Sequence, residues 1–315
     1  MIHPPVDRLE LADRHEAAAW FQAERANVAT LVRTCLANGW SRSAWQLAYS
    51  MFAFNQSHRR WSDWIPLCDE VLEAVQATGD ALGECRMLNV LAVAHKQRGD
   101  FAAARDQYHQ ALRAADAAGE PLAAAAIHVN LGGLYNVQEQ YDLAETHLRA
   151  ALGTAGYGDD PRYGQLLWLN LSHLMFNTGR FEEAADGLRR GLALTETTGD
   201  EHTAAYLYHG LGEVSFQLGR MDEAAEHARQ ALRRATATQD PLRRAYALDL
   251  LGSATMHSAP TEAEASWHEA IAICEELAHP LAEEARYWLE HERPSSASEL
   301  YAAERERRYR VNRLP

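Results

Sequence analysis

Lysine and cysteine are scarce in this sequence. Among its 315 residues there are four cysteines and one lysine, Lys96. A phosphate-binding loop of the G-x-x-x-x-G-K-[ST] type is therefore absent, because its motif needs a lysine. Cys35, Cys68, Cys85 and Cys274 lie far apart without a C-x-x-C pair, which gives no support to a zinc site or a disulfide framework. We expect reduced, mostly buried thiols in a cytoplasmic protein.

The sequence also lacks long apolar runs and an excess of basic residues. No stretch approaches the ~18 apolar residues of a membrane span, and the N-terminus has no apolar core of a signal peptide. We therefore expect no membrane association. The 30 Lys and Arg against 44 Asp and Glu give a formal charge of -14. Because that field repels phosphates, direct binding of nucleic acid is disfavoured.

A regular internal repeat dominates what is present. A leucine recurs every 40 residues without insertion or deletion, and a small residue follows it each time. These key leucines are Leu91, Leu131, Leu171, Leu211 and Leu251. The same register aligns acids at Asp80, Glu120, Asp160, Asp200 and Asp240. Such acids, several followed by proline, predict helix starts, because the carboxylate accepts hydrogen bonds from free backbone N–H groups and proline needs no partner there.

The apolar spacing predicts two helices in each repeat. In the first helix, Leu167, Leu171 and Leu174 fall at i, i+4 and i+7. A glycine-containing turn follows, and a second stripe then begins, as at Ala184 and Leu188. Each repeat is therefore a pair of amphipathic helices.

These residues resemble the tetratricopeptide repeat. From Gly132 of the first helix to Ala144, Leu148 and Ala151 of the second, the steps are 12, 4 and 3 residues, as in that family's pattern. The period of 40 exceeds the usual 34 residues, which implies longer helices or connectors. The resemblance covers residues 41–280 as six repeats. It implies an all-α fold, a right-handed helical solenoid with capping helices at both ends.

The two ends of the chain depart from the pattern. Residues 1–40 are predicted to form an N-terminal capping region, residues 281–292 a C-terminal capping helix, and residues 293–315 an arginine-rich tail. In the first repeat, Phe52 and Trp64 replace two small contact residues. They must either splay the helix pair or pack ring on ring.

A second resemblance is carried by the front of the chain. The segments WFQAERANV at 20–28, AWQLA at 44–48 and WSDW at 61–64 are similar to the tetratricopeptide portion of large actinobacterial regulators of the antibiotic regulatory protein type. Those proteins usually also carry a DNA-binding domain and an ATPase module, whose motifs are not in this sequence. The resemblance therefore implies a sensor or effector module linked to transcriptional or biosynthetic regulation.

A candidate binding surface follows from the helix geometry. Residues five and two before and two and five after each key leucine point away from the core, toward the expected concave groove. In the fourth and fifth repeats these positions combine aromatic and polar groups, which suits an organic ligand or a peptide. The alternative is that the aromatics pack against neighbouring repeats.

Asparagines precede two key leucines. In peptide-binding members of the family, an asparagine at this position holds the ligand backbone; the alternative is a bond to the neighbouring helix. The predicted ligand-binding residues are Asn130, Asn170, Leu169, His173, Phe176, Tyr206, His209, Glu213, Phe216, Tyr246, Asp249 and Met256. The family's clamp for acidic C-terminal peptides needs basic residues two before the leucine. No Lys or Arg occupies that position, so this ligand class is disfavoured.

One constellation has the residue types for chemistry. His209 and Glu213 lie four apart on one helix face, and His173 and Asp249 occupy the flanking helices. Two histidines and two carboxylates suit a general acid and base or a divalent metal. With 15 histidines in the chain such proximity also arises by chance, so we assign no metal and hold these four only as weak catalytic candidates.

Three functions are consistent with the sequence. The first is a non-catalytic module that binds a peptide, a protein segment or a small molecule in the concave groove, without a cofactor. The second is a stand-alone enzyme that uses the His209–Glu213 pair on a substrate resembling a natural product. The third is a scaffold that self-associates through its end caps, for example as a homodimer.

Overall fold

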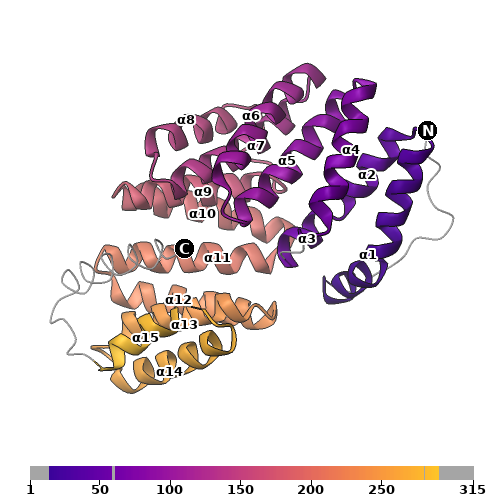
Figure 1. The fold of residues 1–315 in the computed structure, drawn as a ribbon. Coiled ribbons are helices and arrows are strands. Elements are labelled where there is room, and N and C mark those ends of the chain that lie inside the picture. The colour runs from indigo at the N-terminus through magenta and orange to yellow at the C-terminus, as the bar shows by residue number, and fades with distance from the viewer. Residues whose placement is uncertain (1–13, 59–60, 280, 291–315) are drawn as a thin grey trace. The chain divides into compact units, whose positions relative to one another are not determined.

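The computed structural model describes residues 14–58, 61–279 and 281–290, and the regular elements in these ranges are all α-helices (Figure 1). The chain divides into two compact units, unit 1 over residues 1–134 and unit 2 over residues 135–315. Within each unit most successive helices are joined by short turns. The all-α prediction is confirmed.

Unit 1 contains the N-terminal helix, the first two repeats and most of α7. Its helices are α1 (Arg14–Ala37), α2 (Ser41–Ser50), α3 (Phe52–His58), α4 (Trp64–Thr78), α5 (Ala81–Gln97), α6 (Phe101–Ala118) and α7 (Pro121–Val137). The helices α5 and α6 pack against each other as the first and second helix of one repeat. We call the first helix of each repeat the A helix and the second the B helix.

Unit 2 begins in the last turn of α7. Its further helices are α8 (Tyr141–Leu152), α9 (Gly164–Asn177), α10 (Phe181–Thr198), α11 (Glu201–Gln217), α12 (Met221–Ala237), α13 (Pro241–Thr255), α14 (Pro260–Glu276) and α15 (Leu281–Glu290). The A helices α9, α11 and α13 pack against the B helices α10, α12 and α14. The last helix, α15, packs against α14.

Predicted helix starts and stops are found in each unit. Asp80 accepts a hydrogen bond from the backbone N–H of Gly83 at 3.0 Å in unit 1, and Asp200 accepts one from Thr203 at 3.0 Å in unit 2. Gly199, just before Asp200, has a φ of 65°. Because a side chain is strained at such a φ, glycine is favoured where a helix closes in this way.

The key leucines form the core. Leu91 and Leu131 are 0% exposed in unit 1, and Leu171, Leu211 and Leu251 are 3–4% exposed in unit 2. Burying each such side chain contributes about 1.5–3 kcal/mol. The 40-residue register therefore marks the positions that stabilise the fold.

Close helix approach explains the small residue after the key leucine. A Cβ atom added to Gly212 on α11 would lie 2.7 Å from Leu250 Cδ2 and 3.3 Å from the carbonyl oxygen of Ala224 on α12. Both distances are shorter than ordinary van der Waals contact. A glycine therefore lets α11 approach both α12 and α13.

The first repeat departs from the others because its A helix is interrupted. The helix α2 ends at Ser50, and α3 begins at Phe52. The Phe52 ring stacks on Tyr49 with a centroid distance of 5.7 Å and lies 6.4 Å from Trp61. Trp64 is buried at the start of α4. The predicted ring packing therefore occurs for Phe52, through Tyr49 and Trp61.

An irregular segment over residues 153–163 separates α8 from α9. The sequence predicted a helix start at Asp160, but α9 starts at Gly164. Asp160 instead accepts hydrogen bonds from the backbone N–H and the guanidinium of Arg162, at 2.8 and 2.7 Å. The Trp168 indole donates to the carbonyl oxygen of Gly158 at 3.0 Å, which ties the segment to α9. The predicted helix start is therefore wrong, because the carboxylate is engaged within the loop.

The capping helices lie near their predicted positions, as α1 and α15. The arginine-rich tail at 293–315 lies outside the described residues. In the part of the chain that the structure describes, no helix is both long and apolar enough to cross a membrane.

Candidate functional site

The candidate site lies on the A helices of unit 2. The helices α9, α11 and α13 contact one another in this order. A shift of 40 residues relates corresponding positions on them, as for Leu166, Tyr206 and Tyr246. We define the A-helix face by Leu166, His173, Tyr206, His209, Glu213, Arg243 and Tyr246.

The pair His209 and Glu213 is at the centre of this face. His209 Nδ1 lies 3.5 Å from Glu213 Oε2, and the two side chains are 8% and 18% exposed. The His209 ring also meets Tyr246 of α13 edge to face, with a centroid distance of 5.9 Å. The four-residue spacing therefore predicted the contact correctly, but most of the histidine is buried within it.

His173 of α9 is close enough to Glu213 of α11 and Arg243 of α13 for their charges to change its pKa. The residue as a whole is exposed, but the surrounding protein desolvates the imidazole in part and so lowers the pKa of His173. The negative charge of Glu213 on α11 raises this pKa in part, and the positive charge of Arg243 on α13 lowers it further. Charges from three helices therefore act on one imidazole.

Arg243 is the residue on this face that the sequence analysis missed. Its guanidinium carbon lies 3.5 Å from the centre of the Tyr206 ring and 5.3 Å from that of Tyr246. Such cation–π contacts hold the guanidinium plane against aromatic rings. Arg243 lies eight residues before Leu251, beyond the positions that were read from the leucine. The sequence could have indicated Arg243 in one way: it lies one helical turn before Tyr246, a predicted site residue, and so on the same side of the helix.

Asp249 does not line the face, although it was predicted there. It is 1% exposed, and its charge and desolvation raise the pKa of Cys274 on α14 to about 11, with desolvation the larger cause. Asp249 thus belongs to the interior between α13 and α14. Among the described residues, no group of three or more His, Cys, Asp or Glu is placed to hold a metal ion.

Phe216 and Met256 are also core residues and not ligand contacts. Each is 2% exposed, and both pack in one cluster with Leu250 and Trp267. Their positions, five after the key leucine, lie about 140° around the helix from it, at the edge of the face, where a large apolar side chain turns inward. The predicted role of these two side chains in ligand binding is corrected accordingly.

Leu169 and Phe176 of α9 are intermediate cases. Both are half-buried against the core cluster that includes Leu188 and Leu211. Phe176 also meets Phe181 of α10 edge to face at 5.5 Å. Much of their apolar surface is therefore used in packing.

The two predicted asparagines bond within the protein. In unit 1, Asn130 donates from Nδ2 to Asn89 Oδ1 at 2.9 Å, which links α7 to α5. In unit 2, Asn170 donates to the backbone carbonyl of Leu166 at 2.8 Å, one turn earlier in α9. For Asn130 the structure favours the alternative of a bond to the neighbouring helix.

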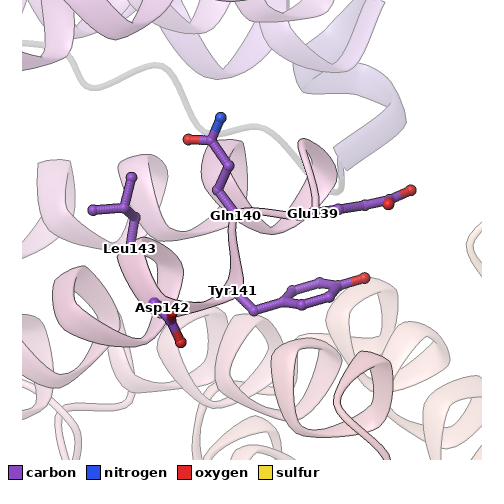
Figure 2. A pocket seen from close by; sticks show the side chains of 5 residues that line it. All are labelled: Glu139, Gln140, Tyr141, Asp142 and Leu143. Carbon is purple, nitrogen blue, oxygen red and sulfur yellow. The ribbon is translucent and has the colours of Figure 1, made fainter.

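A pocket of about 300 Å³ lies at the turn between α7 and α8, and not among the residues of the A-helix face (Figure 2). The five consecutive residues that line it are Glu139, Gln140, Tyr141, Asp142 and Leu143. Figure 2 shows their side chains pointing in different directions from this short stretch. A hollow formed by one turn offers few convergent groups, so the A-helix face is the better candidate.

Family comparisons identify the class of repeat. Residues 85–115, on α5 and α6, and residues 165–237, from α9 to α12, match models of the tetratricopeptide repeat. Both segments therefore consist of tetratricopeptide repeats. The first lies in unit 1 and the second, which spans two helix pairs, lies in unit 2. No curated protein matches the chain.

Solved structures of similar fold extend over most of the chain. Aspartyl phosphate phosphatase F from Bacillus subtilis is 14% identical with a TM-score of 0.64, over 98% of this chain and 78% of that chain. A Rap protein complexed with competence and sporulation factor is 14% identical with a TM-score of 0.59, over 81% and 77% of the two chains. Both likenesses support a helical solenoid of the tetratricopeptide type.

A third similar structure belongs to a larger protein. It is a signal transduction ATPase with numerous domains and a tetratricopeptide repeat sensor, from Pyrococcus horikoshii. The identity is 14% and the TM-score 0.59, over 86% of this chain. The match spans 42% of that protein's length.

Proposed function

We propose that the chain is a binding module that recognises a peptide or a segment of a partner protein on the A-helix face of unit 2. The observation that carries this proposal is the arrangement of Tyr206, Tyr246 and Arg243 beside the His209–Glu213 pair. Aromatic surface and both signs of charge meet there on helices from three repeats. A peptide presents the same mixture of groups.

Exposed apolar surface on this face supports the proposal. Leu166 is 49% exposed on α9, at the repeat position of Tyr206 and Tyr246, which are half-buried. An apolar ligand side chain that covers Leu166 would remove surface from water at about 25 cal/mol per Å². The polar groups beside it would fix the orientation of the ligand.

Relatives of the same fold agree with a binding role. The similar Rap structure was solved with a bound competence and sporulation factor, and the Pyrococcus protein has a repeat region described as a sensor. Together with the resemblance of the front of the chain to large regulators, this leads us to propose a sensory role in transcriptional or biosynthetic regulation. A small-molecule ligand is a further form of the same proposal.

The enzyme alternative has less support. His209 is only 6% exposed and is already in contact with Glu213 and Tyr246. A general base must reach a proton of the substrate, and a ring so covered offers little access. We therefore assign the pair a positioning role in the binding surface.

An array of random heptapeptides immobilised through their N-termini tests the proposal. We expect the protein to select a subset of sequences, and Leu166→Asp to weaken their binding by about tenfold or more. Leu277→Asp is the matched control, because Leu277 is 44% exposed at the end of α14. Selection of no peptide, or equal losses in the two variants, would contradict the assignment.

A further inference from the structure

Arg243 is placed unlike its neighbour in the chain. It is the third residue of α13, and its side chain turns to the tyrosines of the A-helix face. Arg244, the next residue, turns the other way and forms an ion pair with Glu269 of α14. Two adjacent arginines therefore contact different neighbouring helices.

The charge of Arg243 is not neutralised by the described part of the chain. Its guanidinium forms no ion pair with a described carboxylate, whereas that of Arg244 does. This contrasts with Arg229 and Arg234 of α12, which pair with Glu262 at 2.9 Å and with Glu201 at 3.2 Å. A guanidinium without a counter-charge from the described chain is suited to an anionic group of a ligand.

Asp240, three residues before Arg243, and Glu213, which acts on the same His173, have other partners. Asp240 caps α13 by accepting the backbone N–H of Arg243 at 2.9 Å, and its other oxygen lies 3.6 Å from His202 Nδ1. Glu213 lies against His209 at 3.5 Å. Neither carboxylate forms an ion pair with the guanidinium in this arrangement.

We propose that Arg243 binds a carboxylate of the peptide ligand, supplied by its C-terminus or by an Asp or Glu side chain. This inference rests on the proposed function. The contact with Tyr206, at 3.5 Å from the guanidinium carbon to the ring centre, holds the guanidinium on this face. A guanidinium can donate two parallel hydrogen bonds to one carboxylate. Leu166 and Tyr246 lie on the same face for an apolar side chain of the ligand.

This cation occupies a position that the family's clamp does not use. The sequence disfavoured acidic C-terminal peptides because no Lys or Arg stands two residues before a key leucine. Arg243 lies eight residues before Leu251, and its long side chain reaches the face from there. The proposal therefore departs from that expectation.

The net charge of the chain limits the number of carboxylates in the ligand. With a formal charge of -14, the protein repels polyanions at a distance. At physiological salt this repulsion decays over about 8 Å, whereas a direct ion pair with Arg243 is formed at contact. A peptide with a single carboxylate next to apolar residues therefore fits best.

Soluble copies of an array-selected peptide test the proposal by calorimetry. Each is made with a free or amidated C-terminus, and with Asp and Glu kept or replaced by Asn and Gln, so that the two sources of the carboxylate are separated. We expect one of these changes to raise Kd by about tenfold or more, and Arg243→Gln to do the same for the unchanged peptide. Arg243→Gln should then have little effect on the peptide that has lost its carboxylate.

Two further variants complete the design. Arg243→Lys keeps the charge but loses the planar pair of donors, so we expect an intermediate Kd. Arg86→Gln is the control in unit 1, because Arg86 also lies over a tyrosine, Tyr49, at 5.3 Å; it should change Kd by less than about twofold. Circular dichroism of each variant confirms that it is folded.

The outcomes separate this proposal from the proposed function. If binding depends on Leu166 but neither the loss of carboxylates nor Arg243→Gln changes Kd, the module binds peptides and the role of Arg243 is wrong. If no peptide binds, the proposed peptide-binding function and the proposed role of Arg243 are both wrong. As a direct readout, the ¹⁵Nε–¹H signal of Arg243, assigned with Arg243→Lys, should shift when the carboxylate peptide is added and stay in place with its amide or Asn/Gln form.

Discussion

Unit 1 and unit 2 carry the same repeat but present different side chains on their A helices. Two residues after the key leucine, α5 of unit 1 has Val93, which is 5% exposed, whereas α9 and α11 of unit 2 have the exposed His173 and the half-buried Glu213. In unit 1, Asn89 and Asn130 bond to each other at 2.9 Å. The polar groups of the unit 1 A helices are thus partly satisfied internally, while unit 2 offers charges and aromatic rings.

The two units therefore show which positions maintain the fold and which we propose to bind the ligand. The scaffold positions, which are the key leucines, the small residues and the helix caps, recur in both units because each repeat must bury the same stripe. The positions of the A-helix face are free of that demand, so they vary from repeat to repeat. Substitutions at scaffold positions should therefore act alike in both units, and substitutions on the A-helix face of unit 2 should act on binding.

Substitutions at the key leucines should lower the free energy of unfolding most. Leu171→Ala in unit 2 and Leu91→Ala in unit 1 should each lower the free energy of unfolding by about 2–5 kcal/mol, because both leave a cavity. Denaturant unfolding measures this. Leu166→Ala is the control on the same helix as Leu171; since Leu166 is 49% exposed, its change should stay within about 0.5 kcal/mol. Equal losses for Leu166 and Leu171 would show that the register is misread.

A somewhat smaller loss is expected where helices approach closely. Gly212→Leu should destabilise unit 2 by about 1–3 kcal/mol, because the new side chain meets Leu250 and the backbone of Ala224. Thermal unfolding provides the comparison with Gly153→Leu. Gly153 is exposed, and an added Cβ there would be 3.4 Å from its nearest neighbour, so that variant should be nearly neutral. The two variants melting together would refute the close-packing argument.

Helix caps should matter equally in the two units. Asp80→Ala and Asp200→Ala each remove a carboxylate that accepts a backbone hydrogen bond at 3.0 Å. We expect about 0.5–2 kcal/mol of destabilisation from either change, measured by chemical denaturation. A cost in one unit only would show that the caps are not a shared scaffold feature.

The smallest effect expected concerns the titration of His173. Its pKa should lie below 6.5, because desolvation disfavours the charged ring. Glu213→Gln should lower this pKa further, and Arg243→Gln should raise it, while Arg86→Gln in unit 1 leaves it unchanged. NMR titration of the ring, assigned with His173→Asn, measures each shift; opposite signs would mean that the three helices are not arranged as described.

The same shift fixes the sign of a pH effect on stability. The unfolded chain binds the His173 proton at a higher pH than the folded chain does, so stability is lost as pH falls from about 6.5 through the lowered pKa. His173→Asn should remove this contribution and flatten the pH dependence between those limits.

The sequence predicted the scaffold well, because the period of 40 reports directly on burial. Leu131 and Leu211 lie where the register predicted, and the contact of His209 with Glu213 follows from their spacing. The burial of side chains at the edge of the A-helix face was harder to predict. Phe216 turns into the core while Phe176, at the same repeat position, is half-buried. Local packing, which the helical period does not encode, decides between the two.

Arg243 and the loop before α9 show two further limits. A long side chain reaches a face that its Cα does not point toward, so reading directions from the leucine excluded Arg243. The Asp160 carboxylate bonds with Arg162 two residues later, a local competitor of helix capping. Such competition between neighbouring side chains depends on geometry and not on periodicity.

In our proposal, the A helices of unit 2 recognise the ligand. Hydrogen–deuterium exchange with and without an array-selected peptide tests this most directly, because both units are read in one experiment. We predict slower exchange in α9, α11 and α13 on adding the peptide, with α5 in unit 1 unchanged. Protection confined to α5, or equal protection of A helices in both units, would contradict the claim.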